Sequence, residues 1–154
     1  MIIHLATDHA GFAHKEEIAT WLLSEGYEVI DHGASQFNED DDFTDFISLA
    51  VSAVSKEAAN TRAVIFGGSG QGEAMLANRY PNVRAVVYYG GDESVPALSR
   101  QHNNSNVLSV GARFVSVDAA KKAIWDWLHT AALSEGKYER RNQKIEAITK
   151  QLRS

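Results

Sequence analysis

The chain has 154 residues, 44% of them hydrophobic and 23% charged, which is typical of one globular domain with a hydrophobic core. The net charge of −5 argues against bulk attraction to nucleic acid, and the lack of cysteine excludes disulfides, a thiolate nucleophile and cysteine-ligated zinc. No apolar run approaches the roughly 20 residues of a membrane span, and the N-terminus lacks a signal-peptide pattern. We therefore expect a single cytoplasmic domain over residues 1–154.

The first half of the chain reads as strand, helix, strand and helix. Residues 2–7 form a short apolar run, and apolar residues at helical spacing follow it up to Gly26, where a glycine can end a helix. Residues 27–31 predict a second strand. The polar, acidic stretch 33–41 predicts a surface loop, and the helix after it is expected to end near Ala59.

The second half continues the alternation. Residues 62–66 predict a third strand, which a glycine-rich loop and a helix running to about Arg79 follow. Residues 83–88 and 106–110 predict the last two strands, with a helix between them. Another amphipathic helix follows, and a last helix rich in Arg, Lys and Glu is expected over residues 138–152.

Strands that alternate with helices predict a parallel sheet with helices on both faces. The expected fold is therefore a three-layer, Rossmann-like α/β domain around a five-stranded parallel sheet. The last helix is too hydrophilic to fill a core alone, so we expect it to pack on a partner subunit.

The glycine-rich loop is the strongest local signal. Residues 66–73 read Phe-Gly-Gly-Ser-Gly-Gln-Gly-Glu between an apolar strand and a helix start. Backbone N–H groups and the helix dipole favour an anionic ligand in such a place, although a tight turn alone would also use glycine. The loop lacks the Gly-Lys-[Ser/Thr] step of a nucleotide P-loop, and no G-x-G-x-x-G follows the first strand.

Polar residues stand at the ends of three predicted strands. Asp8 and His9 follow the first strand, the glycine loop follows the third, and Arg113 lies just after the fifth. Singly, each residue has an ordinary explanation: Asp8 as a helix cap, or His102 as a cation at the end of a helix. Ligands bind beyond the carboxyl ends of parallel strands, so their joint occurrence predicts a site there. No set of Cys and His residues has metal-ligand spacing, and His9 and His14 stand isolated, so the sequence does not predict a metal site.

Three segments resemble a known family. Asp8-His9-Ala10-Gly11, the run 68–73 with Ala77-Asn78, and Arg100-Gln101-His102-Asn103-Asn104 are similar to the signature segments of type B ribose-5-phosphate isomerases and galactose-6-phosphate isomerase subunits. The resemblance covers about residues 2–146. It implies reversible aldose–ketose isomerisation of a sugar phosphate through an enediolate, without metal or other cofactor. It also implies a homodimer or tetramer whose sites combine residues of two subunits.

The resemblance assigns a role to each matching residue. One branch of the family carries its proton-shuttling cysteine at the position of Gly67, whereas another uses a glutamate, which Glu73 matches. Ser69 then suits the oxyanion, His102 matches the ring-opening residue, and Asp8 matches a catalytic residue that hydrogen-bonds the sugar and helps to open the ring. The substrate-binding positions that the resemblance implies are His9, Gly68, Gly70, Gln71, Gly72, Asn78, Asn103, Arg113, Lys137 and Arg141. Of these, His9, Arg113, Lys137 and Arg141 fall at phosphate contacts.

The match departs from the family near the C-terminus. Lys137 stands where an arginine is usual, and Tyr138 replaces a common histidine. Lysine neutralises a phosphate without offering the bidentate fork of arginine. Ribose 5-phosphate is therefore the simplest substrate, while a six-carbon sugar phosphate of the allose or galactose 6-phosphate type stays open. Two further hypotheses are a non-catalytic sugar-phosphate-binding subunit and a flavodoxin-like cofactor binder.

Overall fold

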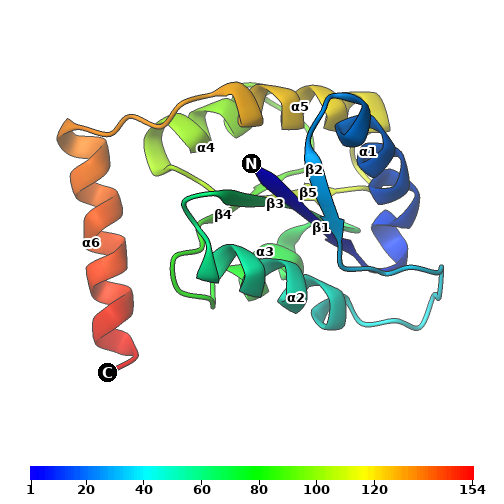
Figure 1. The fold of residues 1–154 in the computed structure, drawn as a ribbon, viewed down its shortest axis with the longest axis horizontal. Coiled ribbons are helices and arrows are strands. Elements are labelled where there is room, and N and C mark those ends of the chain that lie inside the picture. Colours follow the sequence, from blue (N-terminus) through cyan, green and yellow to red (C-terminus); the bar gives the residue numbers. More distant parts are fainter.

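A computed structural model describes residues 1–154 and confirms the five-stranded parallel sheet with helices on both faces (Figure 1). The strands run in the order β2-β1-β3-β5-β4, and all neighbours are parallel. The strands are β1 (Ile2–Thr7), β2 (Glu28–Asp31), β3 (Thr61–Gly67), β4 (Ala85–Tyr88) and β5 (Val107–Gly111). Each lies within two residues of its predicted position.

The helices alternate with the strands as predicted. They are the 3-10 turn η1 (His9–Gly11), α1 (Phe12–Ser24), α2 (Phe43–Lys56), α3 (Gln71–Ala77), α4 (Val95–Asn103), α5 (Val117–His129) and α6 (Gly136–Leu152). The expected ends of α2 at Ala59 and of α3 at Arg79 were too late. After α2, Glu57 leaves helical geometry, because periodicity alone does not locate the residue at which a helix frays.

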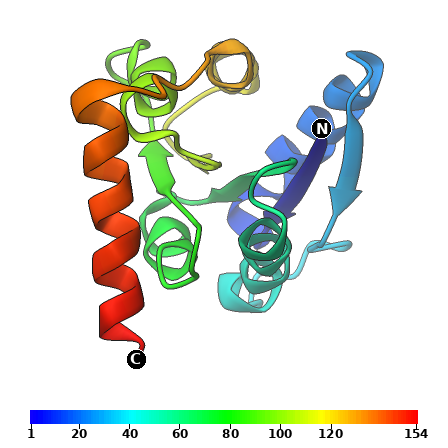
Figure 2. The same cartoon turned by 60° about the vertical axis from the view of Figure 1, so that its left-hand side comes forward.

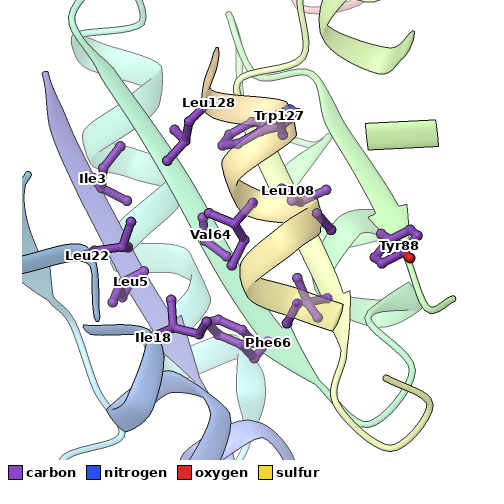
Figure 3. Packing of buried hydrophobic residues seen from close by; sticks show 14 of the residues in the cluster. Ile3, Leu5, Ile18, Leu22, Val64, Phe66, Tyr88, Leu108, Trp127 and Leu128 are labelled. Carbon is purple, nitrogen blue, oxygen red and sulfur yellow. The ribbon is translucent and has the colours of Figure 1, made fainter. Parts of the chain in front are cut away.

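One face of the sheet is covered by α1 and α5. Figure 3 shows the cluster between them, in which Leu5, Val64 and Leu108 come from three adjacent strands and Trp127 comes from α5. All four side chains are fully buried. Burying a large apolar side chain stabilises a fold by about 1.5–3 kcal/mol, so this layer fixes the central strands firmly.

The opposite face is covered by α2 and α3, which lie together below the sheet in Figure 1. Ile47, Val51 and Val54 of α2 pack there against Ala63 and Ile65 of β3. Strand β3 is thus buried from both faces, as expected for the central strand of a doubly covered sheet.

Helix α6 stands apart from this body. It lies beside α4 at one side of the molecule, and both views show it projecting as a separate rod (Figures 1 and 2). It contains no buried residue, and Ile145, Ile148 and Leu152 are exposed. Its main attachments are an Arg84–Glu146 ion pair of 2.5 Å and a hydrogen bond of 3.2 Å from Asn142 to the His102 carbonyl. None of the helices has the length and apolar character that crossing a membrane requires.

Candidate active site

The carboxyl ends of β1, β3 and β5 lie side by side at the centre of the sheet. Thr7 pairs with Phe66, and Gly67 pairs with Gly111, so the residues after the three strands are brought to one edge. The chain connects β1 to β2 on one side and continues at β3 on the other, which makes the β1–β3 boundary a topological switch point. In open parallel sheets, ligands bind at this point.

Glu73 lies at this edge in the first turn of α3 and is only 5% exposed. Its carboxylate packs directly against Gly67, where a methyl group on Cα would overlap it. Burial raises the pKa of Glu73, and the nearby charge of Asp8 raises it further, while a hydrogen bond from its own backbone amide has the opposite effect. A buried carboxyl with a raised pKa is suited to exchange protons near neutral pH.

The glycine loop is fixed by hydrogen bonds to β5 and its extension. The amides of Ala112 and Arg113 donate to the carbonyls of Gly67 (2.8 Å) and Gly68 (3.1 Å). Ser109 donates its hydroxyl to the Gly70 carbonyl at 2.7 Å, and Gly70 has the positive φ of 77° that favours glycine. The shape of the loop is therefore determined by contacts within the chain.

The remaining residues of the loop occupy its outer side. The hydroxyl of Ser69 accepts a hydrogen bond from the amide of Gln71 at 3.3 Å, and Gln71 is exposed. A Cβ on Gly72 would lie 3.1 Å from the ring of Phe43, and one on Gly68 would lie 3.1 Å from the Arg113 guanidinium. The loop therefore brings Arg113 over Gly68, close to the edge that holds Glu73.

Asp8 and His9 follow β1 at the same edge. Asp8 is 8% exposed, and its Oδ1 accepts a hydrogen bond of 2.9 Å from the amide of Ala10, as a cap of the short η1 turn. The predicted capping role is therefore confirmed. The second carboxylate oxygen of Asp8, Oδ2, lies 3.9 Å from Nδ1 of His9.

His9 contacts a residue that the sequence did not single out. Its ring Nδ1 lies 2.7 Å from Oδ1 of Asp41, and the same oxygen accepts the His9 amide at 3.0 Å. This hydrogen bond with Asp41 is the main reason that the pKa of His9 is raised; Asp8 adds to it, while burial and Arg113 oppose it. Asp41 lies in the predicted acidic loop, where three acidic residues in a row, 39–41, gave no reason to select one.

Asp8, His9 and Asp41 are the residues whose side-chain atoms could surround a cation, since one ligand atom from each lies within 4.8 Å of the others. In this structure the imidazole and the Asp41 carboxylate bond directly to each other. The cationic guanidinium of Arg113 is also close enough to influence His9. We therefore assign this cluster to hydrogen bonding.

A second group of predicted residues lies on α4 and α6. The imidazole of His102 stacks on the ring of Tyr138, with centroids 4.4 Å apart and planes 7° from parallel. Lys137 places its Nζ 5.2 Å from the same ring. Asn103 and Arg141 are exposed nearby. We call His102, Asn103, Lys137, Tyr138 and Arg141 the α4–α6 group.

The structure thus divides the predicted site in two. Asp8, His9, Gly68, Glu73 and Arg113, together with Asp41, form what we call the carboxyl-edge cluster. No hydrogen bond, ion pair or ring contact joins this cluster to the α4–α6 group within one chain.

Asn78 belongs to neither group. Its side chain donates to the Ala85 carbonyl at 3.0 Å and accepts the Ala85 amide at 2.8 Å, which ties the end of α3 to β4. Asn78 also lines a groove of about 330 Å³ between α6 and the body, with Asn103, Arg84 and Glu146 on its walls. Its predicted contact with substrate stays a prediction.

Comparison with known proteins agrees with this geometry. Residues 3–145 match the family described as Ribose/Galactose Isomerase. The ribose-5-phosphate isomerase B of Escherichia coli K12 is 37% identical over 149 residues, which is 96% of this chain and 93% of that protein. The probable ribose-5-phosphate isomerase B of Mycoplasma genitalium is 34% identical over 143 residues, covering 93% of this chain and 92% of the relative.

Solved structures give the same result. A crystal structure of ribose-5-phosphate isomerase B from Mycoplasma genitalium with bound ribulose-5-phosphate superposes with a TM-score of 0.91 at 34% identity, over 97% of this chain and 96% of that one. The enzyme from Clostridium thermocellum gives 0.90 at 36% identity over 99% of both chains. With sequence and fold in agreement, the chain belongs to the ribose/galactose isomerase family of aldose–ketose isomerases.

Proposed function

We propose that this protein interconverts ribose 5-phosphate and ribulose 5-phosphate, with Glu73 as the base that moves a proton between C2 and C1. The observation that carries the proposal is the buried carboxyl of Glu73 at the carboxyl edge, with its pKa raised by burial. The relatives named ribose-5-phosphate isomerase B, one of them solved with ribulose-5-phosphate bound, support the choice of substrate.

The reaction follows from a carboxylate at this position. Glu73 removes the proton from C2 of the open-chain aldose, which leaves an enediolate, and returns it to C1 as the carbonyl moves to C2. Its raised pKa makes the base stronger, although it must be ionised at the start. The hydroxyl of Ser69 and the amides of the glycine loop supply hydrogen-bond donors for the developing oxyanion.

The phosphate and ring-opening roles need cations and a histidine near the same substrate. His9 and Arg113 lie in the carboxyl-edge cluster. His102, Lys137 and Arg141 belong to the α4–α6 group, so we propose that a second copy of the chain brings them to the site. The projecting α6 supports this proposal, because Arg141, Ile145 and Ile148 are spaced to share one exposed helix face.

Replacing Glu73 by glutamine tests the proposal. Glu73→Gln keeps the shape of the side chain but cannot accept the C2 proton, so we expect kcat to fall by about 10²-fold or more. Exchange of the C2 proton with deuterated solvent should fall equally, while binding of the sugar phosphate is retained. Glu28→Gln, at the amino end of the sheet, is the matched control. Near-normal turnover in Glu73→Gln would reject Glu73 as the base.

Lys137 supports a second candidate substrate. Lysine binds phosphate as a point charge, and here its ammonium group lies over the Tyr138 ring, so the phosphate site differs from one with two arginines. A six-carbon sugar phosphate would then be the preferred substrate. Assays with five- and six-carbon aldose phosphates decide between the two, and sugar-phosphate binding without C2 exchange would identify a non-catalytic subunit.

A further inference from the structure

His9 is held by a single carboxylate oxygen of a residue 32 positions away in the chain. Oδ1 of Asp41 accepts the His9 amide at 3.0 Å and faces the ring Nδ1 at 2.7 Å. The Asp41 side chain is only 8% exposed. The ring of Phe37 meets the imidazole edge-on, with centroids 6.3 Å apart. Both the backbone and the ring of His9 are thus fixed to the loop before α2.

This contact determines which nitrogen of the imidazole carries a proton. A carboxylate only accepts hydrogen bonds, so Nδ1 of His9 must be the donor to Asp41. A neutral ring would then present a bare Nε2, which repels phosphate oxygens. Only the doubly protonated ring offers an Nε2–H donor, and Nε2 makes no hydrogen bond within the chain.

The charges around His9 favour this cationic form. Asp8 on the preceding position and Asp41 are negative, while Arg113 after β5 is positive, and the net result is a raised pKa of His9. The charge of Asp8 also acts on Glu73, whose pKa it raises. Oδ2 of Asp41 is buried and has no hydrogen-bond partner. Its negative charge is therefore not shared with a donor at Oδ2 and acts on the His9 imidazole.

We propose that Asp41 is a positioning residue, which holds the His9 imidazole as a cation whose Nε2–H receives a phosphate dianion. Asp41 itself touches no substrate; it acts through His9 and adds to the charge that Arg113 supplies. That the ligand is a phosphate depends on the proposed function. The His9–Asp41 pair depends only on contacts within the chain itself.

Asp41→Asn separates charge from geometry, because the amide oxygen can still accept both His9 hydrogen bonds. Asp40→Asn is the matched control, since it removes the same charge one residue away from an exposed side chain without a partner. The His9 ring is followed by NMR in the free protein, with its signals identified by their loss in His9→Gln. We expect His9 to titrate above the usual value of about 6.5 in wild type and Asp40→Asn, and at a lower pH in Asp41→Asn than in either of them.

Two results would overturn the proposal at this stage. One is a wild-type His9 that titrates at or below the usual value, a measurement that needs no variant. The other is an unchanged His9 titration in Asp41→Asn. Neither depends on isomerase activity, so a chain without that activity would disprove the proposed function while leaving this test intact.

Binding of inorganic phosphate then tests the consequence. We compare its affinity in Asp41→Asn and wild type by calorimetry, as a ratio at each pH, so that titration of phosphate itself cancels. The ratio should be closest to one at about pH 5.5 and should rise to about tenfold in favour of wild type near pH 8, because a lower pKa of His9 in Asp41→Asn removes the imidazole cation at a lower pH. With ribose 5-phosphate, KM should follow the same trend and kcat should be retained. A ratio independent of pH contradicts the assigned role.

Discussion

The carboxyl-edge cluster and the α4–α6 group are built in opposite ways. In the cluster, Asp8 and Glu73 are buried at the ends of strands that the core fixes from both faces. In the group, Lys137 and Arg141 are exposed on a helix without a single buried residue. The chain by itself therefore fixes the groups that we propose for proton transfer. It leaves the cations that we propose for the phosphate on a helix that contributes no residue to the core.

The largest effect should come from disturbing the carboxyl-edge cluster. Gly67→Ala puts a methyl group where the Glu73 carboxylate lies. A displacement on the order of 1 Å costs about 10²-fold in rate, so we expect a loss of that size in kcat with a well-folded protein. Gly26→Ala is the control, since its φ of 85° makes alanine strained while nothing lies within 4 Å. It should lower the melting temperature and leave kcat unchanged.

Mixing two inactive variants tests whether the carboxyl-edge cluster of one subunit and the α4–α6 group of another form one active site. If Glu73 of one copy works with His102 of another, Glu73→Gln and His102→Ala refolded together should recover about one quarter of wild-type activity. Half of the dimers are then mixed, and one of their two sites is intact. Glu73→Gln mixed with Asp8→Asn should recover nothing, because both residues lie in one cluster. Equal activity in the two mixtures would show that each chain carries a complete site.

A charged residue on the exposed face of α6 tests whether this face contacts another copy of the chain. Ile148 is 55% exposed, and Ile148→Glu should weaken self-association by about tenfold or more if this face is covered by another copy. Sedimentation at a series of concentrations measures the effect. Gln143→Glu adds the same charge to an exposed position elsewhere on α6 and should leave association intact. An unchanged molecular mass in Ile148→Glu would remove α6 from the interface.

The smallest expected effect is on the stability of the fold, which the buried carboxyl of Glu73 lowers. Because the folded state raises the pKa of Glu73, the unfolded chain releases this proton more readily, and the ionised carboxylate disfavours folding above the ordinary glutamate pKa of about 4.3. Glu73→Gln should therefore be more stable than wild type near neutral pH, with the gain vanishing as pH falls below about 4. Urea unfolding at several pH values measures this.

Much of this architecture could be predicted from sequence, because the signals are local. Short segments of four to seven residues mark the strands, Asp8 and Arg113 lie within two residues of strand ends, and Glu73 lies in the first turn of the helix after β3. Parallel topology then requires these residues to share one edge. Asp41 could not be predicted in this way, since its contact with His9 spans 32 residues and starts from a loop without periodicity. The separation of α6 from the body was expected only from its polarity, whereas its attachment through Arg84 and Asn142 depends on tertiary contacts.

The contact between Gly67 and Glu73 also has an evolutionary consequence. The carboxylate fills the volume that any side chain at position 67 would need. The family resemblance implies a second branch whose reactive cysteine stands at that position, so the proposed glutamate base and such a cysteine would compete for one space. If Glu73 is the base, as we propose, a thiol installed at position 67 would displace it, and loss of the glutamate alone would leave the site without a base. A change from one base to the other would then require both substitutions together.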